Sequence, residues 1–300
     1  MKYDEFLDYV RESVSQFMGE GYDVSIHKVL KNNGLELNGI VIMKAGNHAT
    51  PTIYLDEFYE QYKRGKEVYE IIEEIVDLYD RHKDRMEIDF SFFSDFEIMR
   101  NKILYRLINY ESNEALLNDV PHRRFLDLAI VYYVIVDSDT LGNGSVLLHQ
   151  CHLDMWKVNE AEIYEIAKVN TKSFLEYRLS SMRDIAKMIL GDDVCLEQMG
   201  MDNGCCDDIY VLSNNRKFYG AAAVLYDGML DDIACGLNSN LYVIPSSVHE
   251  VIIIPQNVMP DCKDVLTGMV REINERDVEI VDRLSDYVYE YDREQKALHI

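Results

Sequence analysis

The sequence predicts an α+β protein in which antiparallel sheets pack against amphipathic helices, arranged in two lobes. Predicted helices and strands occur in blocks and not as a repeating strand–helix–strand series, which argues against a parallel sheet. Several predicted strands are neighbours in the chain and are joined by short turns, as in antiparallel hairpins. The 300 residues suffice for two ordinary domains, and we place them at 1–115 and 116–300. A single compound domain is the alternative, since only the stretch 111–121 favours this division.

The chain begins with an amphipathic helix and a hairpin. Apolar residues between Tyr3 and Met18 recur at helical spacing, and Gly19 ends the helix. In residues 22–43, alternating strands flank "NNG", whose residue types adopt the left-handed conformations of a hairpin turn. Residues 66–85 form a second helix with one apolar and one acidic side.

The remaining elements are mostly strands. We expect single strands at 102–110, 125–136, 145–156, 208–214 and 220–226, and hairpins at 241–255 and 285–300. We expect helices at 159–178, capped by Asn159, at 227–238 and at 262–276, the last buried through Leu266, Met269, Val270 and Ile273. Residues 137–145 and 191–207 are loops by their Asp, Gly and Asn content.

The net charge of −24, from 54 acidic and 30 basic residues, restricts the partners. Binding a phosphate backbone or an anionic lipid surface requires a basic footprint, so we expect neither nucleic-acid nor membrane binding. An acidic surface primarily favours solubility. The alternative is that the acidic side chains imitate DNA and occupy a DNA-binding protein.

No segment has the pattern of a membrane span or a secretory signal. The longest apolar run, 128–136, is much shorter than the roughly 17–25 residues that cross a bilayer. The N-terminus is acidic and amphipathic, unlike a signal peptide. The six cysteines are scattered without a CxxC pair, which indicates reduced thiols. We therefore expect a cytoplasmic protein.

The segment "LYVIPSSVHEVIIIP" places Ser246, Ser247, His249 and Glu250 between two apolar strands. A nucleophilic serine needs a base within hydrogen-bond reach and a third group that orients the base. Because His249 and Glu250 are adjacent, their side chains point to opposite faces of an extended backbone and do not serve one serine together. We favour a turn in which the serine hydroxyls bond to backbone groups. Ser247 and His249 are the catalytic candidates if the protein is an enzyme.

The segment "PHRR" contains the other candidate site residues. His122 is a third catalytic candidate. Arg123 and Arg124 form a candidate anion clamp, because guanidinium groups bind carboxylates and phosphates in a bidentate manner. The simpler interpretation is that both arginines pair with the many acidic residues of the chain.

Two segments contain metal-ligand residue types in unfavourable arrangements. If 149–154, "HQCHLD", is a strand, its His and Cys residues are divided between two faces, and neither face offers three ligands. In 202–208, "DNGCCDD", neighbouring aspartates raise the pKa of the thiols and oppose an activated nucleophile. Nucleotide-binding glycine loops, hydrolase elbows and zinc-protease motifs are absent from the sequence. We expect neither a metal nor a cofactor.

Five segments are distinctive in sequence: "DIYVLSNNRKFYGAAAVLYDGMLDDIACGLNSNLYVIPSSVHEVIIIPQ", "VPHRRFLDLAIVYYV", "HLDMWKVNEAEIYEIAKVNT", "MVREINERDVE" and "LSDYVYEYDRE". Together they resemble a bacterial family of domains of unknown function found in anaerobic gut bacteria. The resemblance extends over most of the chain. It implies a cytosolic bacterial origin and transfers no activity, cofactor or catalytic residue.

These observations favour a non-catalytic binding protein whose partner is another protein or a second copy of the chain. The first alternative is a hydrolase or transferase with a site assembled around His249, Ser247, His122 and Arg123. The second is an acidic DNA mimic that inhibits a host or phage enzyme. The enzyme hypothesis requires at least two of these side chains, or Glu250, to converge in one cleft.

Overall fold

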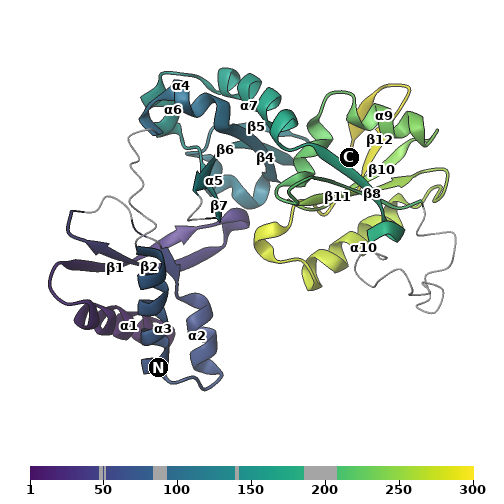
Figure 1. Cartoon of the computed structure of the whole chain (residues 1–300). Helices are drawn as coiled ribbons and strands as arrows, with labels where there is room; N and C mark the ends of the chain where they lie inside the picture. Colours follow the sequence, from purple (N-terminus) through teal and green to yellow (C-terminus); the bar gives the residue numbers. More distant parts are fainter. Residues whose placement is uncertain (47–49, 51, 84–92, 139–141, 186–207) are drawn as a thin grey trace. The chain divides into compact units, whose positions relative to one another are not determined.

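The computed structural model describes residues 1–46, 50, 52–83, 93–138, 142–185 and 208–300 (Figure 1). In these residues helices accompany three β-sheets, and all strand pairs with a described register are antiparallel. The predicted α+β class is therefore confirmed. Within this part of the chain, no helix combines the length and the apolar character needed to cross a membrane.

The chain divides into two compact units. The first comprises Met1–Phe92 with Asp137–Asn143, and the second comprises Phe93–Val136 with Gly144–Ile300. The boundary expected between residues 115 and 116 falls inside the second unit.

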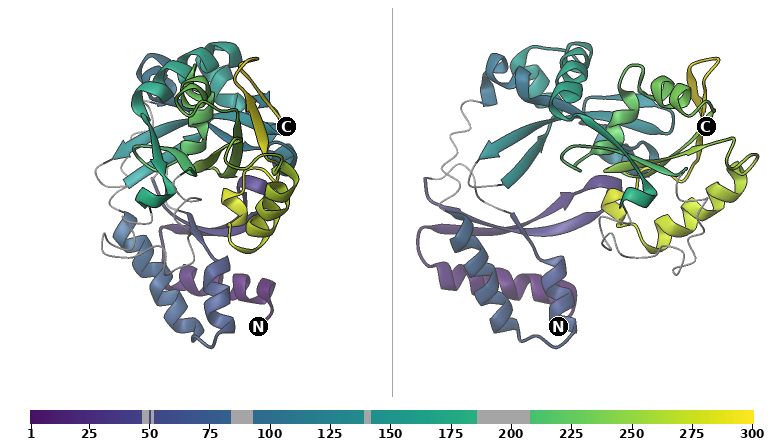
Figure 2. Two further views of the ribbon diagram at one scale, coloured as in Figure 1. Left: turned by 90° about the vertical axis from the view of Figure 1, so that its right-hand side faces the viewer. Right: turned by 45° about the vertical axis from the view of Figure 1, so that its right-hand side comes forward.

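The first unit packs three helices against one sheet. Its elements are α1 (Tyr3–Met18), β1 (Tyr22–Leu30), β2 (Glu36–Lys44), β3 (Thr52–Tyr54), α2 (Asp56–Lys63) and α3 (Val68–Lys83). The helices lie on one side of the sheet (Figure 2), where α1 buries Phe6, Val10 and Val14. Asn33 and Gly34 have positive φ values of 57° and 70°, as expected for the hairpin turn. The predicted first helix and hairpin are confirmed, and α2 was not predicted.

The second unit begins with a small sheet in the order β4-β6-β5, with β7 also paired to β6. Its elements are α4 (Phe96–Met99), β4 (Ile103–Asn109), α5 (Glu114–Leu117), β5 (His122–Phe125), β6 (Leu128–Ser138), β7 (Gly142–Leu147), α6 (Gln150–Trp156) and α7 (Glu160–Phe174). The side chain of Asn159 caps α7 by accepting from Glu162 N at 3.1 Å, as predicted. Thr171 of α7 accepts from the backbone N of Tyr105 at 3.0 Å and ties the helix to β4.

Three predictions in this region need correction. The strand expected at 125–136 is the hairpin of β5 and β6, which turns at Leu126, with φ of 55°, and Asp127. The only polar residue of this segment, Asp127, lies at the turn. Of the strand expected at 145–156, only the first residues are extended, as the end of β7, and α6 follows after His149. The backbone N of His149 donates to His152 Nδ1 at 2.9 Å at the start of this helix. The loop expected at 137–145 is also shorter, because β6 extends to Ser138 and β7 starts at Gly142.

The larger sheet of the second unit has six strands in the order β13-β12-β10-β11-β9-β8. Its strands are β8 (Tyr177–Ser181), β9 (Tyr210–Asn214), β10 (Leu241–Ser247), β11 (Glu250–Pro255), β12 (Tyr289–Asp292) and β13 (Ala297–His299). The accompanying helices are η7 (Gly220–Leu225), α9 (Met229–Gly236) and α10 (Lys263–Arg276). The hairpins predicted at 241–255 and 285–300 are confirmed as β10–β11 and β12–β13.

Three further predictions need correction. The strand expected at 220–226 is the 3-10 helix η7. The helix expected at 159–178 ends at Phe174, and β8 starts at Tyr177. In α10, Leu266 and Val270 are buried, but Met269 and Ile273 are exposed, because the buried side continues along the helix to Asn274, which bonds to Ser285 O. Residues 84–85 of the expected second helix and the expected loop 191–207 lie outside the described residues.

Candidate functional site

The polar turn between β10 and β11 has internal hydrogen-bond partners. Ser247 Oγ accepts from the backbone N of His249 at 3.1 Å. His249 Nδ1 accepts from the backbone N of Tyr219 at 3.2 Å, so its ring proton is on Nε2, which lies 3.4 Å from Asp282 Oδ1. The imidazole also stacks on the Tyr219 ring. The side chains of Ser247 and His249 thus bond to different backbone groups and not to each other, and the acid beside the imidazole is Asp282 and not Glu250.

The "PHRR" residues do not form a clamp. Side chains alternate along β5, and Arg123 pairs with Glu160 at 3.1 Å while its guanidinium lies 3.8 Å from the Tyr164 ring centroid. Arg124 lies over the Tyr110 ring and donates to a backbone carbonyl. His122 Nδ1 bonds to the backbone carbonyl of Val120 at 2.8 Å. Each of the three side chains is therefore held by a different neighbour.

The histidines of "HQCHLD" cap α6. His149 Nδ1 lies 2.7 Å from Asp119 Oδ2, and His152 packs edge-on against Phe93. Burial and the neighbouring His149 lower the pKa of His152. Among the described residues, no group of three or more His, Cys, Asp or Glu side chains has a metal-binding arrangement. The segment 202–208 with its two cysteines lies outside those residues, apart from Asp208.

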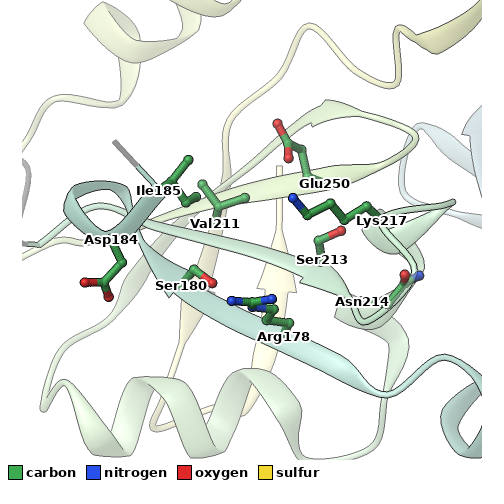
Figure 3. A pocket seen from close by; sticks show the side chains of 9 residues that line it. All are labelled: Arg178, Ser180, Asp184, Ile185, Val211, Ser213, Asn214, Lys217 and Glu250. Carbon is green, nitrogen blue, oxygen red and sulfur yellow. The ribbon is translucent and has the colours of Figure 1, made fainter. Parts of the chain in front are cut away.

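A cleft of about 130 Å³ lies on the larger sheet, over β8, β9 and the start of β11. The residues that line it are Arg178, Ser180, Asp184, Ile185, Val211, Ser213, Asn214, Lys217 and Glu250. Sites for drug-sized ligands typically enclose roughly 300–1,000 Å³, so this cleft fits a single functional group such as a carboxylate or phosphate. Figure 3 shows the guanidinium of Arg178 beside Ser180 and the amine of Lys217 on the side of Glu250, while the carboxylate of Asp184 points away from both cations.

Strand register brings the floor of the cleft together. Arg178 of β8 is directly opposite Ser213 of β9, and Ser180 is opposite Val211. Directly opposed residues share a face of the sheet. Val211 is in turn opposite Ile252 of β11, and Glu250, two residues earlier on β11, is on that same face. Residues far apart in the sequence thus form one polar surface.

The turn after β9 positions Lys217. The buried side chain of Asn214 accepts from the backbone N of Arg216 at 3.0 Å and donates to Phe218 O at 2.8 Å. Lys217 itself has φ of 53°, a conformation that most residues avoid and that surrounding structure must impose. The side chain of Lys217 therefore projects from a braced turn.

His249 and Gly220 support the same turn from the other side. His249 accepts from Tyr219 N, and the backbone carbonyl of His249 accepts from Ser213 Oγ at 2.8 Å. A Cβ on Gly220 would lie 2.3 Å from Ser213 Oγ and 2.5 Å from His249 O, so only glycine fits between them. His249, which the sequence suggested as a catalytic residue, thus supports the wall of the cleft.

The charged groups of the cleft have no ion-pair partner in the described part of the chain. None of the ion pairs or side-chain hydrogen bonds found there involves the side chains of Arg178, Lys217, Asp184 or Glu250. Several other basic residues, such as Arg123 and Lys263, pair with acids. Arg178 and Lys217 differ because two cations without an acid partner among the described residues line one cleft.

Two other hollows have polar groups that already bond within the protein. In the hollow of about 530 Å³ near Tyr3, Asp56 accepts from the Tyr3 hydroxyl at 2.6 Å. Burial and Asp56 raise the pKa of Tyr3 to about 12, so the hydroxyl stays a donor. In the hollow of about 220 Å³ near Asn109, Asp127 accepts from the hydroxyls of Ser285 and Tyr289. Each of these hollows is lined by one arginine, Arg64 near Tyr3 and Arg271 near Asn109, whereas the cleft is lined by two basic residues.

Of the cleft residues, sequence reasoning named only Glu250, in a different role. Arg178 fell inside an expected helix, and Lys217 lies in a turn that carried no motif. The signal that points to the turn is "SNNRKFYG", in which Asn residues precede the lysine and Gly follows it, as in tight turns.

Comparison with known proteins gives one match. The model of a family described as "Family of unknown function (DUF5688)" matches residues 3–293, which confirms the resemblance to a family of unknown function. No curated protein and no solved structure matches the chain.

Proposed function

Since the chain belongs to this family of unknown function, its role must be argued from its own residues, and we propose that it binds an anionic group of a protein partner in the cleft, without chemistry of its own. The observation that carries the proposal is that Arg178 and Lys217 line one cleft and that neither has an acid partner among the described residues. Charge-assisted hydrogen bonds from such groups are the usual means of holding a carboxylate or phosphate.

The surroundings suit an anion of small size. Ser180 supplies a hydroxyl donor on the floor, and Val211 supplies an apolar contact, whereas the hydroxyl of Ser213 already donates to His249 O. The rim acids Asp184 and Glu250 are exposed to solvent, where their repulsion of an anion is weakened by water. The site therefore favours modest, reversible binding, in which the remainder of the partner supplies further affinity.

Nuclear magnetic resonance of the ¹⁵N-labelled full chain tests the proposal. Sodium acetate and inorganic phosphate are titrated in turn, and the signals of Arg178, Ser213 and Lys217 are followed, with sodium chloride as the reference for ionic strength. We expect shifts at these residues, and the combined variant Arg178→Gln, Lys217→Gln should weaken the binding about tenfold or more. Glu250→Gln should strengthen it about twofold, because a like charge is removed from the rim.

Lys172→Gln provides a matched control. Lys172 is an exposed lysine of α7 outside the cleft, so its replacement removes one positive charge, as each of the two cleft substitutions does, without touching the site. If the cleft variant and this control bind acetate and phosphate as the unaltered protein does, the proposal is wrong. The DNA-mimic hypothesis predicts that outcome, because a mimic binds basic partners through its surplus acids and is indifferent to Arg178.

A further inference from the structure

The cleft lies beside an open sheet edge, and we infer that its ligand is an extended peptide that pairs with β8 and places an acidic side chain opposite Arg178. This inference rests on the proposed function and specifies the kind of partner. β8 is the last strand of the six-stranded sheet and pairs on one side only, with β9, among the described residues. A strand with one unpaired side is a template for a further strand.

The hydrogen-bond pattern identifies the groups that point outward. Asn215 N donates to Glu176 O at 2.9 Å, and Met182 N donates to Ile209 O at 2.8 Å. In an antiparallel ladder every second residue directs its N–H and C=O to the same neighbour, so the even-numbered residues of β8 face β9. The backbone groups of Tyr177 and Leu179 therefore face away from the sheet, where no described strand bonds to them.

The same alternation places the side chains. A peptide whose backbone pairs with Tyr177 and Leu179 has its intervening residue directly opposite Arg178, with both side chains on the cleft face. Arg178 is exposed on that face and lines the cleft together with Lys217. An aspartate or glutamate at the intervening position would form an ion pair with Arg178, which has no acid partner among the described residues.

The residues next to this position suit an extended segment. Tyr177 is 52% exposed and points to the opposite face of the sheet, where it offers an aromatic surface to the residue that pairs with it. β8 contains no proline and no irregular pairing with β9, two features that commonly protect an edge strand. The edge is therefore regular enough to accept backbone hydrogen bonds from a partner.

Blocked peptides test the inference on the full-length protein. The probe is acetyl-Thr-Val-Asp-Val-Thr-amide, and its binding is measured by isothermal titration and by shifts of the Tyr177 and Leu179 amide signals. N-methylation of the valine before the aspartate removes an N–H that faces β8 and should weaken binding about tenfold or more. N-methylation of the aspartate removes an N–H that points away from β8 and should leave affinity within about twofold.

The charged contact is tested with a second pair of changes. Replacement of the aspartate by asparagine in the peptide should weaken binding about fivefold to the unaltered protein, and much less to Arg178→Gln, because the two changes remove the same interaction. The control variant Lys172→Gln should bind the asparagine peptide about fivefold more weakly than the aspartate peptide, as the unaltered protein does.

The results separate this inference from the proposed function. If acetate binds through Arg178 and Lys217 but both N-methylated peptides bind equally, the strand addition is wrong and the anion cleft stands. If neither acetate nor any peptide responds to Arg178→Gln, both are wrong. If the Tyr177 and Leu179 signals change with protein concentration alone, β8 pairs with a second copy of the chain, and the peptide inference is overturned.

Discussion

The two ends of one face of the six-stranded sheet differ in what covers them. Towards β10, Tyr242, Ile244 and Ile254 are buried against Leu266 and Val270 of α10. Towards β8, the positions on the same face hold Arg178, Ser180 and Ser213, and the cleft opens above them. The strands continue from one end to the other with the same antiparallel pairing, so the ends differ in side chains and not in backbone.

This difference shows why the cleft and not the β10–β11 turn is the better candidate site. A sheet face that a helix covers is apolar, because burial of apolar surface stabilises the contact. Polar groups that are buried nearby, such as Asn214, are satisfied within the protein. Arg178 and Lys217 fit neither pattern, since they are exposed and have no described partner, and this is the arrangement expected of groups that meet a ligand.

The largest expected effect is a loss of stability at the end of the sheet that α10 covers. Leu266→Ala removes a side chain that is only 6% exposed, and we expect it to lower the free energy of unfolding by about 2–5 kcal/mol. Arg178→Gln, at the open end, should change it by less than about 0.5 kcal/mol while it weakens the binding of acetate. Urea unfolding measures both changes.

The exposed side of α10 provides the control for this prediction. Met269 is 53% exposed on the same helix, and Met269→Ala should also stay within about 0.5 kcal/mol. Equal losses for Leu266→Ala and Met269→Ala would mean that α10 does not cover the sheet as described, and the comparison between the two ends would then fail.

Gly220→Ala is expected to have the next largest effect, because it acts on the wall of the cleft. The added Cβ would meet Ser213 Oγ, His249 O and Asn214 N at 2.3, 2.5 and 2.8 Å, and the required shift should cost about 1–3 kcal/mol. Since these groups brace the turn of Lys217, phosphate affinity should fall as well.

Gly268→Ala in α10 is the matched glycine-to-alanine change, and it should raise the free energy of unfolding instead of lowering it. Nothing lies within 4 Å of a Cβ at Gly268, and alanine in a helix should stabilise the protein by about 0.5–1 kcal/mol. The prediction for Gly220 is refuted if Gly220→Ala is as stable as the unaltered protein and retains its phosphate affinity in the same titration.

The sequence predicted those parts of the fold in which local pattern and packing agree. Helical spacing located α1 and α10, and the turn types located the β1–β2 and β10–β11 hairpins. The prediction from sequence failed where contacts between residues far apart in the chain determine the local structure. Residues 220–226 contain strand-forming Val and Tyr but form η7, because Gly220 packs against Ser213 and His249.

The cleft was not predictable for the same reason. Arg178 becomes a cleft residue only because β8 pairs with β9 across a sequence separation of about thirty residues. The argument that adjacent side chains diverge correctly separated His249 from Glu250, but it gave no means of finding which distant groups converge. The ring of His249 meets Asp282 and Tyr219, and both contacts depend on the folded chain.

The smallest effect expected is that of His249→Ala, and it distinguishes a supporting histidine from a catalytic one. The backbone N–H of Tyr219 loses its acceptor, which should cost about 1 kcal/mol at this half-buried position, and phosphate affinity should fall as the turn of Lys217 loosens. His249→Asn keeps a carbonyl oxygen near the position of Nδ1 and should restore most of both losses. An amide cannot accept a proton as a general base does, so a catalytic histidine would not be rescued in this way. Recovery of phosphate binding in His249→Asn, measured in the same titration as for Gly220→Ala, therefore supports the braced cleft, and equal loss in both His249 variants contradicts it.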